Sequence, residues 1–262
     1  MSILEREDLG AVTRLTLNAP GSLNALSDAM LAALTEALGE LRDTPSCRVI
    51  ILAGTGKAFC AGHDLKEMQA HRGDADGGRA AWKDLFDRCA TFMQMIPAQP
   101  QPVIAQVHGL ATAAGCQLVA SCDMAVATDD CRFGVNGVNI GLFCSTPMVA
   151  LTRNIARKQA FEMLTTGEFI PATRARELGL INRMVPAADL EANTLALATQ
   201  VAGKLGSAVK IGKSAFYKQI EMPLADAYAY TGDVMVENMA HKDTGEGVQA
   251  FIDKRPPDWS QE

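Results

Sequence analysis

The chain has 262 residues, of which 48% are hydrophobic and 21% are charged. Chains of this length bury roughly three quarters of their unfolded surface, so a folded core is expected and wholesale disorder is excluded. The 24 basic and 30 acidic residues give a net charge of −6 without any basic block, which argues against nucleic acid as a partner.

The first half of the chain predicts strands that alternate with helices. Residues 11–18 alternate in polarity and, together with residues 3–8, predict a strand pair. Ser27 is placed to cap a helix whose apolar residues recur at helical spacing. Three short apolar runs are typical of buried strands, at residues 48–53, 103–107 and 123–127. Strands separated by helices in this way favour parallel pairing.

Helical patterns dominate the rest of the chain. Residues 82–96 carry apolar side chains at helical spacing, and Pro97 is expected to end that helix. Small residues at 111–116 lead into a compact helix, and the pattern is almost entirely helical from Pro147 onward. Because the sequence contains no repeat and no linker, we predict one folded unit of the α/β class.

The seven cysteines are expected to be buried, reduced thiols. Their number is odd and no C-x-x-C pair occurs, so neither a disulfide framework nor a zinc site is predicted. The N-terminal residues are acidic and lack an apolar core, unlike a transit or signal peptide. Residues 103–127, the most apolar region, are interrupted by polar side chains and are not expected to span a membrane. A cytoplasmic protein is therefore expected.

Common catalytic and metal-binding motifs are missing from the sequence. Residues 54–57 follow a predicted strand as a phosphate-binding loop does, but Ile51 replaces the first glycine of that motif and Ala58 its hydroxyl residue. The four histidines show no ligand spacing, so no metal is predicted. No Gly-x-Ser-x-Gly nucleophile motif occurs either.

Two segments, residues 57–68 (KAFCAGHDLKEM) and residues 102–123 (PVIAQVHGLATAAGCQLVASCD), share an unusual design. Each runs from a buried strand or turn through small residues into a short helix. Small residues let a ligand approach the backbone, and a helix N-terminus presents unpaired N–H groups. Two such termini could converge on one developing oxyanion, although the local pattern taken alone favours ordinary tight packing.

These two segments resemble the signature regions of the crotonase (enoyl-CoA hydratase/isomerase) superfamily. The resemblance extends in order from about residue 8 to residue 258, with further similar stretches LTLNAPGSLNALS, TGEFIPATRARELGLINRMVP and AFIDKRPPDW. Residues 137–147, GVNIGLFCSTP, resemble more particularly the branch that contains enoyl-CoA hydratase domain-containing protein 3.

The resemblance implies a crotonase-like spiral of ββα units with a helical C-terminal trimerisation region. Residues 1–200 would form the core that carries the CoA-binding and oxyanion-hole segments, and residues 201–262 the helical region of the same folded unit. It also implies a lyase of fatty acid metabolism that acts on an acyl-CoA thioester, with CoA as part of the substrate and no further cofactor. The assembly would be a homotrimer or a dimer of trimers.

The resemblance carries over to individual positions. The oxyanion-hole donors would be the backbone N–H groups of His63 and Ala114. Trp82 and Phe86 would line the acyl pocket, on a helix whose farther apolar positions are plain core. The CoA contacts would come from Ser22, Leu23, Ala25, Ala61, Asp64, Leu65 and Lys66 and, from a neighbouring subunit, Phe251 and Lys254.

One departure from the family concerns acid–base chemistry. Hydratases of this family hold a water between two glutamates, because addition across a double bond needs one proton donor and one acceptor. Gln117 and Gly137 stand at those two positions here. Neither the amide of a glutamine nor a glycine, which has no side chain, can transfer a proton. A general acid or base typically raises the reaction rate by about 10²–10⁴-fold. Ordinary hydration is therefore not expected, whereas a backbone oxyanion hole survives.

Three hypotheses follow. The first is a hydratase/isomerase-family enzyme with a rearranged acid–base set. Cys144 at a predicted helix start is one candidate substitute, although a small buried residue is the favoured interpretation of this cysteine. The second is a decarboxylase of malonyl-type CoA esters, because loss of carbon dioxide generates the enolate without a base. The third is a catalytically inactive acyl-CoA-binding protein.

Overall fold

The computed structural model describes residues 2–260, and its centre is a six-stranded sheet. The first two strands in the order β1-β2-β3-β4-β6-β9 are antiparallel, and the other neighbours are parallel. The expected strand pair and the expected parallel pairing are both confirmed. The strands are β1 Leu4–Leu9, β2 Val12–Leu17, β3 Val49–Gly54, β4 Val103–Val107, β6 Met124–Thr128 and β9 Arg183–Val185.

A second, three-stranded sheet of order β5-β7-β8 was not expected from the sequence. Its strands are two or three residues long, which is too short to show an alternating pattern. They are β5 Leu110–Thr112, β7 Arg132–Gly134 and β8 Ile170–Pro171. Its first strand, β5, follows β4 directly in the chain and leads into the helix that the small residues at 111–116 predict.

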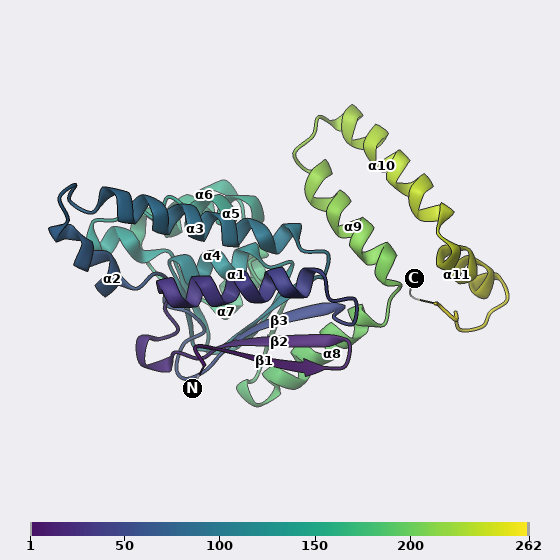
Figure 1. Cartoon of the computed structure of the whole chain (residues 1–262), viewed down its shortest axis with the longest axis horizontal. Helices are drawn as coiled ribbons and strands as arrows, with labels where there is room; N and C mark the ends of the chain where they lie inside the picture. The colour runs from purple at the N-terminus through teal and green to yellow at the C-terminus, as the bar shows by residue number, and fades with distance from the viewer. Residues whose placement is uncertain (1, 261–262) are drawn as a thin grey trace.

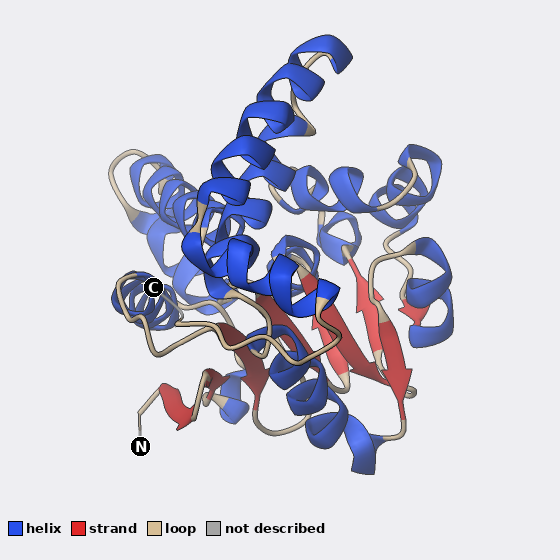
Figure 2. Cartoon of the chain, turned by 90° about the vertical axis from the view of Figure 1, so that its right-hand side faces the viewer, coloured by secondary structure: helices blue, strands red, loops and turns tan. Residues whose placement is uncertain are grey.

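Helices cover both faces of the large sheet (Figure 2). Those preceding the C-terminal region are α1 Asp28–Arg42, α2 Leu65–Ala70, α3 Arg79–Ala98, α4 Ala114–Ser121, α5 Pro147–Asn154, α6 Arg157–Thr166, α7 Ala172–Leu178 and α8 Leu190–Ala202. Successive side chains of a strand point to opposite faces. Val49 and Ile51 accordingly pack with residues of α8, and Ile50 and Leu52 pack with residues of α1, α3 and α4.

The ends of two helices test the sequence predictions. The Ser27 hydroxyl accepts a hydrogen bond from the Met30 N–H at 3.2 Å, so the predicted cap of α1 is confirmed. The expectation that Pro97 ends α3 is wrong by two residues, because Pro97 lies inside the helix and Ala98 is its last residue. A proline in the last turn removes only one intrahelical N–H, and Pro100 and Pro102 follow just beyond.

Three helices project from the body as a C-terminal arm, α9 Gly206–Gln219, α10 Leu224–Ala240 and α11 Lys242–Ile252 (Figure 1). A buried ammonium holds the arm to the body: Lys213 Nζ donates to the carbonyls of Ile96 and Gln101 at 2.8 and 2.9 Å, and to Asp123 Oδ2 at 2.7 Å. The Tyr217 hydroxyl donates to the other oxygen of Asp123 at 2.8 Å. No helix among residues 2–260 combines the length and apolarity of a membrane span.

Candidate functional site

The candidate site forms where the chain leaves the carboxyl ends of β3 and β4. The loops after these strands run side by side through three backbone hydrogen bonds. The Phe59 N–H donates to the carbonyl of His108 at 3.1 Å, and the Cys60 N–H donates to the carbonyl of Leu110 at 3.2 Å. The Thr112 N–H donates in return to the carbonyl of Cys60 at 3.1 Å. The two segments that the sequence singled out are therefore brought together, and each enters its helix, α2 or α4, from this contact.

Two unpaired backbone N–H groups lie at this contact. Gly62 has φ +89°, and a Cβ built on it would lie 2.9 Å from the Cβ of Ala113 and 3.1 Å from the nitrogen of Ala114. Ala113 itself has φ +49°, a strained conformation for alanine, and its N–H donates to Gly134 at 2.9 Å. The N–H groups of His63 and Ala114 have no acceptor among the described residues. Neighbouring donors of this kind can receive the oxygen of a polarised carbonyl.

Gly115 explains why α4 can begin so close to the other loop. A Cβ at this position would lie 2.1 Å from the carbonyl oxygen of Cys60, well inside van der Waals contact. Only glycine leaves room for the loop to pass over the first turn of the helix. The small residues of this segment therefore serve the approach of backbone to backbone.

The predicted CoA-binding loop lies against the same segment. Ala61 N–H donates to the carbonyl of Leu23 at 3.0 Å, and Leu26 N–H donates to Gly62 at 2.7 Å. Ser22 and Leu23 are exposed, whereas Ala25 is buried. The structure thus brings the loop at residues 20–26 beside the loop that precedes His63.

Asn24 is a positioning residue that the sequence analysis missed. Its side-chain oxygen accepts from Ala19 N–H at 2.9 Å, and its amide donates to the carbonyls of Thr55 and Ala58, both at 2.8 Å. Its φ of +55° is one that asparagine tolerates better than most residues. An asparagine four residues after a proline that opens a turn is the only sequence signal for this role, and it is a weak one.

The start of α2 contains two exposed residues and one side chain that caps the helix. The Asp64 carboxylate caps the helix by accepting from Lys66 N–H at 2.8 Å and Glu67 N–H at 3.3 Å. Leu65 and Lys66 are exposed on the first turn. Lys66 is therefore available to a phosphate, whereas the Asp64 side chain stabilises the helix and is not free for a ligand.

The His63 side chain points toward α3. Its ring packs edge-on against Phe86, with 5.6 Å between centroids, and both ring nitrogens are buried without a hydrogen-bond partner among the described residues. Burial lowers the pKa of His63, so the imidazole is neutral at neutral pH. Trp82 lies one turn before Phe86 and donates its indole N–H to the carbonyl of Met68 at 2.8 Å. Phe86 therefore contacts a residue of the candidate site, whereas Trp82 is hydrogen-bonded to α2.

The two positions of the missing glutamates differ in the space around them. Gln117 lies in the first turn of α4, buried, and its side-chain oxygen has no partner among the described residues. Gly137 is buried in a 3₁₀ turn, where a Cβ would lie 2.2 Å from the carbonyl oxygen of Leu142 and 2.9 Å from Cys144 Sγ. Gln117 occupies a place that a glutamate could take, whereas Gly137 has no room for any side chain.

The idea of a thiolate at Cys144 is not supported. Cys144 precedes α5 by three residues and is buried, and burial raises the pKa of its thiol. A buried thiol of raised pKa is a poor nucleophile and a poor base. The other six cysteines are also buried and unpaired, as expected from the sequence.

Phe251 and Lys254 are not brought to the site of their own chain. Phe251 lies in the last turn of α11 and Lys254 two residues beyond that helix, at the opposite end of the molecule from α2 (Figure 1). Phe251 is 84% exposed. The structure therefore keeps these two residues away from the candidate site of their own chain.

Comparisons with known proteins agree with this geometry. The sequence profile of the enoyl-CoA hydratase/isomerase family matches residues 7–262. The chain belongs to this family. A solved structure of an enoyl-CoA hydratase from Mycobacterium smegmatis superposes with a TM-score of 0.94 at 52% identity and 99% coverage of both chains. The crotonase fold expected from the sequence is confirmed.

Two further relatives carry the name enoyl-CoA hydratase domain-containing protein 3, mitochondrial. The Xenopus laevis protein is 46% identical over 260 residues, which cover 99% of this chain and 86% of that protein. The human protein is 45% identical over 254 residues, covering 97% of this chain and 82% of that protein. The resemblance of residues 137–147 to this branch of the family is therefore confirmed.

The same names correct the expected location. A cytoplasmic protein was inferred from the cysteines and the N-terminal composition, but the relatives from Xenopus laevis, mouse and human are all named as mitochondrial. The inference was wrong because buried, reduced thiols suit any reducing compartment. The amino-acid composition of a folded domain does not identify the cellular compartment in which the protein works.

Proposed function

We propose that this family member binds the CoA thioester of an acyl group and stabilises its enolate with the backbone N–H groups of His63 and Ala114. The observation that carries the proposal is the contact of Gly62 with Ala113, beside which both unpaired donors lie. Such donors are aimed before the reaction starts and need no reorganisation. Each is worth roughly 10²–10³-fold in rate when negative charge develops on the carbonyl oxygen.

The CoA moiety would lie along the loops that precede α1 and α2. Its phosphates would meet the Lys66 ammonium, and the acyl chain would run between His63, Phe86 and Trp82. No cofactor beyond CoA is required, because the oxyanion hole consists of backbone. The remaining contacts would come from Ser22, Leu23, Ala25, Ala61, Leu65 and the backbone of Asp64.

We further propose a homotrimer or a dimer of trimers in which the helical region at residues 201–262, part of the same folded unit as residues 1–200, packs on a neighbour. Phe251 and Lys254 of that neighbour would complete the CoA site. Support comes from the exposed apolar side chains of α10 and α11, among them Leu224, Tyr228, Met235, Val236 and Phe251. An exposed apolar surface of this extent is typical of a protein interface.

The reaction would be a lyase-type conversion of an acyl-CoA with a rearranged acid–base set, not ordinary hydration. Gln117 can orient a water or a substrate hydroxyl through its unpaired oxygen but cannot transfer a proton. Of the two residues proposed as oxyanion-hole donors, only His63 has a titratable side chain, and its neutral imidazole would accept or return a proton. Cys144 has no role in this scheme.

Decarboxylation of a malonyl-type CoA ester is the second candidate. There the bond between the carboxylate carbon and the α-carbon breaks, its electron pair enters the enolate, and carbon dioxide leaves. A later proton on the α-carbon completes the reaction. The neutral Gln117 side chain favours this reaction over hydration, because no general base is needed. A catalytically inactive acyl-CoA-binding protein is the third candidate.

Mass spectrometry of a CoA-ester panel distinguishes the candidates. The purified protein would be incubated with crotonyl-CoA, butyryl-CoA, malonyl-CoA and methylmalonyl-CoA. Loss of carbon dioxide from the malonyl-type esters identifies a decarboxylase, and another mass change identifies a lyase with a rearranged site. A product of unchanged mass but different chromatographic retention identifies an isomerase. Binding without turnover identifies the inactive binder. Failure of every CoA ester to bind would overturn the proposed function.

A further inference from the structure

Ala113, the residue before one of the two proposed donors, has a backbone conformation that alanine rarely adopts. Its φ of +49° and ψ of −120° lie outside the regions that are usual for residues with a side chain. A conformation of this kind persists only where the surrounding contacts hold it. Because the ψ angle of Ala113 orients the peptide bond to Ala114, those contacts also set the direction of the Ala114 N–H.

Backbone hydrogen bonds hold Ala113 from two sides. Its N–H donates to the carbonyl of Gly134 at 2.9 Å, and its carbonyl accepts from the Gln117 N–H at 3.0 Å. Ala113 stands at the N-cap position of α4, and its methyl side chain cannot cap the helix. Any side-chain support therefore comes from a neighbouring residue.

Thr112 has the one polar side chain in residues 110–115. It is 7% exposed, and its hydroxyl donates to the side-chain oxygen of Asn136 at 2.6 Å. Thr112 ends β5, directly before Ala113. Asn136 opens the 3₁₀ turn Asn136–Ile140, which follows β7. The hydrogen bond therefore joins the strand that precedes the strained residue to a turn beside it.

The turn that carries Asn136 is itself held in place. The Leu142 N–H donates to the carbonyl of Gly137 at 2.9 Å, and the Asn139 amide donates to the carbonyl of Gly167 at 3.2 Å. A Cβ on Gly137 would meet the carbonyl oxygen of Leu142, so the turn packs tightly against the chain that follows it. Asn136 therefore offers a fixed acceptor to the neighbouring strand.

We propose that Thr112 and Asn136 are positioning residues of the oxyanion hole. Their side-chain hydrogen bond holds Ala113 in its strained conformation and so directs the Ala114 N–H toward the thioester carbonyl. Neither side chain contacts the substrate, and the direction of the His63 N–H does not depend on them. This role rests on the proposed function, because it presupposes a carbonyl bound between His63 and Ala114.

Infrared difference spectroscopy of bound butyryl-CoA, labelled with ¹³C at the thioester carbonyl, tests this role. Hydrogen bonds to a carbonyl oxygen lower its stretching frequency, so binding to the wild type should lower the frequency of the ester. Thr112→Val keeps the shape of the side chain but removes the hydroxyl, and we expect it to lose about half of that shift, the share of one of two donors. Thr112→Ser keeps the hydroxyl and should retain most of the shift.

A change at the other end of the hydrogen bond provides a second measurement. Asn136→Ala removes the acceptor at a half-buried position and should lose the same share of the shift. The double variant of Thr112→Val with Asn136→Ala should lose no more than either single variant, because all three lack the same hydrogen bond. A double variant that loses the sum of the two single losses overturns the proposal.

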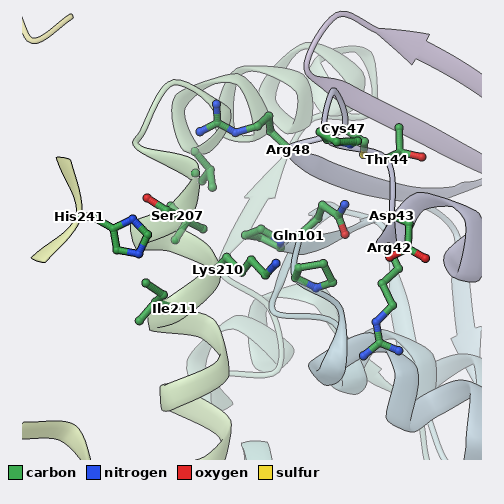
Figure 3. Close-up of a pocket in the computed structure, with 16 residues that line it drawn as sticks. Arg42, Asp43, Thr44, Cys47, Arg48, Gln101, Ser207, Lys210, Ile211 and His241 are labelled. Carbon is green, nitrogen blue, oxygen red and sulfur yellow. The ribbon is translucent and has the colours of Figure 1, made fainter. Parts of the chain in front are cut away.

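Two threonines away from the site provide matched controls. Thr194 is buried in α8, and its hydroxyl donates to the carbonyl of Leu190 at 2.8 Å. Thr44 lines a cavity of about 650 Å³ beside the starts of β3 and β4, at the opposite ends of these strands from the candidate site (Figure 3). Its hydroxyl donates to the carbonyl of Glu40 at 2.8 Å. Thr194→Val and Thr44→Val should keep the full shift.

The outcomes separate this role from the proposed function. A normal wild-type shift that Thr112→Val and Asn136→Ala both retain overturns the positioning role alone. An equal loss in Thr194→Val also overturns it, because the loss of any buried threonine hydroxyl would then act in the same way. A bound ester without any shift in the wild type overturns the proposed oxyanion hole and this role with it.

Discussion

Gly62 lies against Ala113 so closely that a Cβ on the glycine would come within 2.9 Å of the alanine Cβ. Both residues have positive φ, and each directly precedes one of the two unpaired N–H groups. The direction of these donors is therefore set by two constrained backbone positions. The proposed oxyanion hole therefore does not depend on the two glutamates that this chain lacks.

Substitution of Gly62 by alanine should damage the site more than the fold. The new methyl group forces the loop away from α4 and turns the His63 N–H, so turnover of any CoA ester that reacts should fall by roughly 10²–10³-fold, the worth of one donor. Steady-state kinetics would measure the loss. Gly39→Ala, in the exposed part of α1 where a Cβ meets nothing within 4 Å, is the control and should leave turnover unchanged.

The glutamate positions should respond unequally to substitution. Gln117→Glu places a carboxyl in a buried site that already holds an isosteric side chain, so the protein should fold and crotonyl-CoA hydration should rise only slightly. Gly137→Ala should cost about 1–3 kcal/mol of unfolding free energy through overpacking against Leu142. Urea unfolding and a hydration assay would measure both. Full hydratase activity in the single Gln117→Glu variant would contradict this account.

Acid should destabilise the protein through His63. Its pKa is lowered in the folded chain, so between that value and the ordinary 6.5 the unfolded chain binds more protons. Stability is therefore fully present above about pH 6.5 and falls as the pH drops through this window. Urea midpoints of the wild type and of His63→Gln between pH 7 and pH 5 would measure the effect. Equal losses in the two proteins would rule out His63 as the source.

The buried lysine of the arm should be essential for stability. Lys213 and Asp123 have side chains only 6% and 13% exposed, so Lys213→Met leaves a buried carboxylate without its cation. Removing one partner of such a pair costs about 3–5 kcal/mol. The double variant Lys213→Met with Asp123→Asn should recover part of that loss in urea unfolding. If the double variant is no more stable than Lys213→Met alone, the cost does not arise from the unpaired charge.

The sequence predicted the large elements well, because their signals are repetitive. The periodic apolar residues of α1 and α3 and the three apolar runs of β3, β4 and β6 each repeat a pattern over several turns or residues. The small sheet of β5, β7 and β8 was missed because its strands are too short to show one. The end of α3 was misplaced because a single proline in the last turn does not stop a helix.

The site was predictable only in part. The small residues around Gly62 and Ala113 indicated a close approach of backbone, and the structure shows that approach. The role of Asn24 depends on acceptors more than 30 residues away, so no local pattern identifies it. The obstruction at Gly137 depends on the path of the loop through Leu142, which the sequence does not specify.

The central claim is that backbone N–H groups polarise a bound thioester carbonyl. Infrared difference spectroscopy of butyryl-CoA labelled with ¹³C at that carbonyl tests it most directly, because hydrogen bonds to a carbonyl oxygen lower its stretching frequency. We expect the bound ester to absorb at a lower frequency than the free ester, and Gly62→Ala to lose most of that shift. A bound ester whose carbonyl frequency equals that of the free ester would contradict the account.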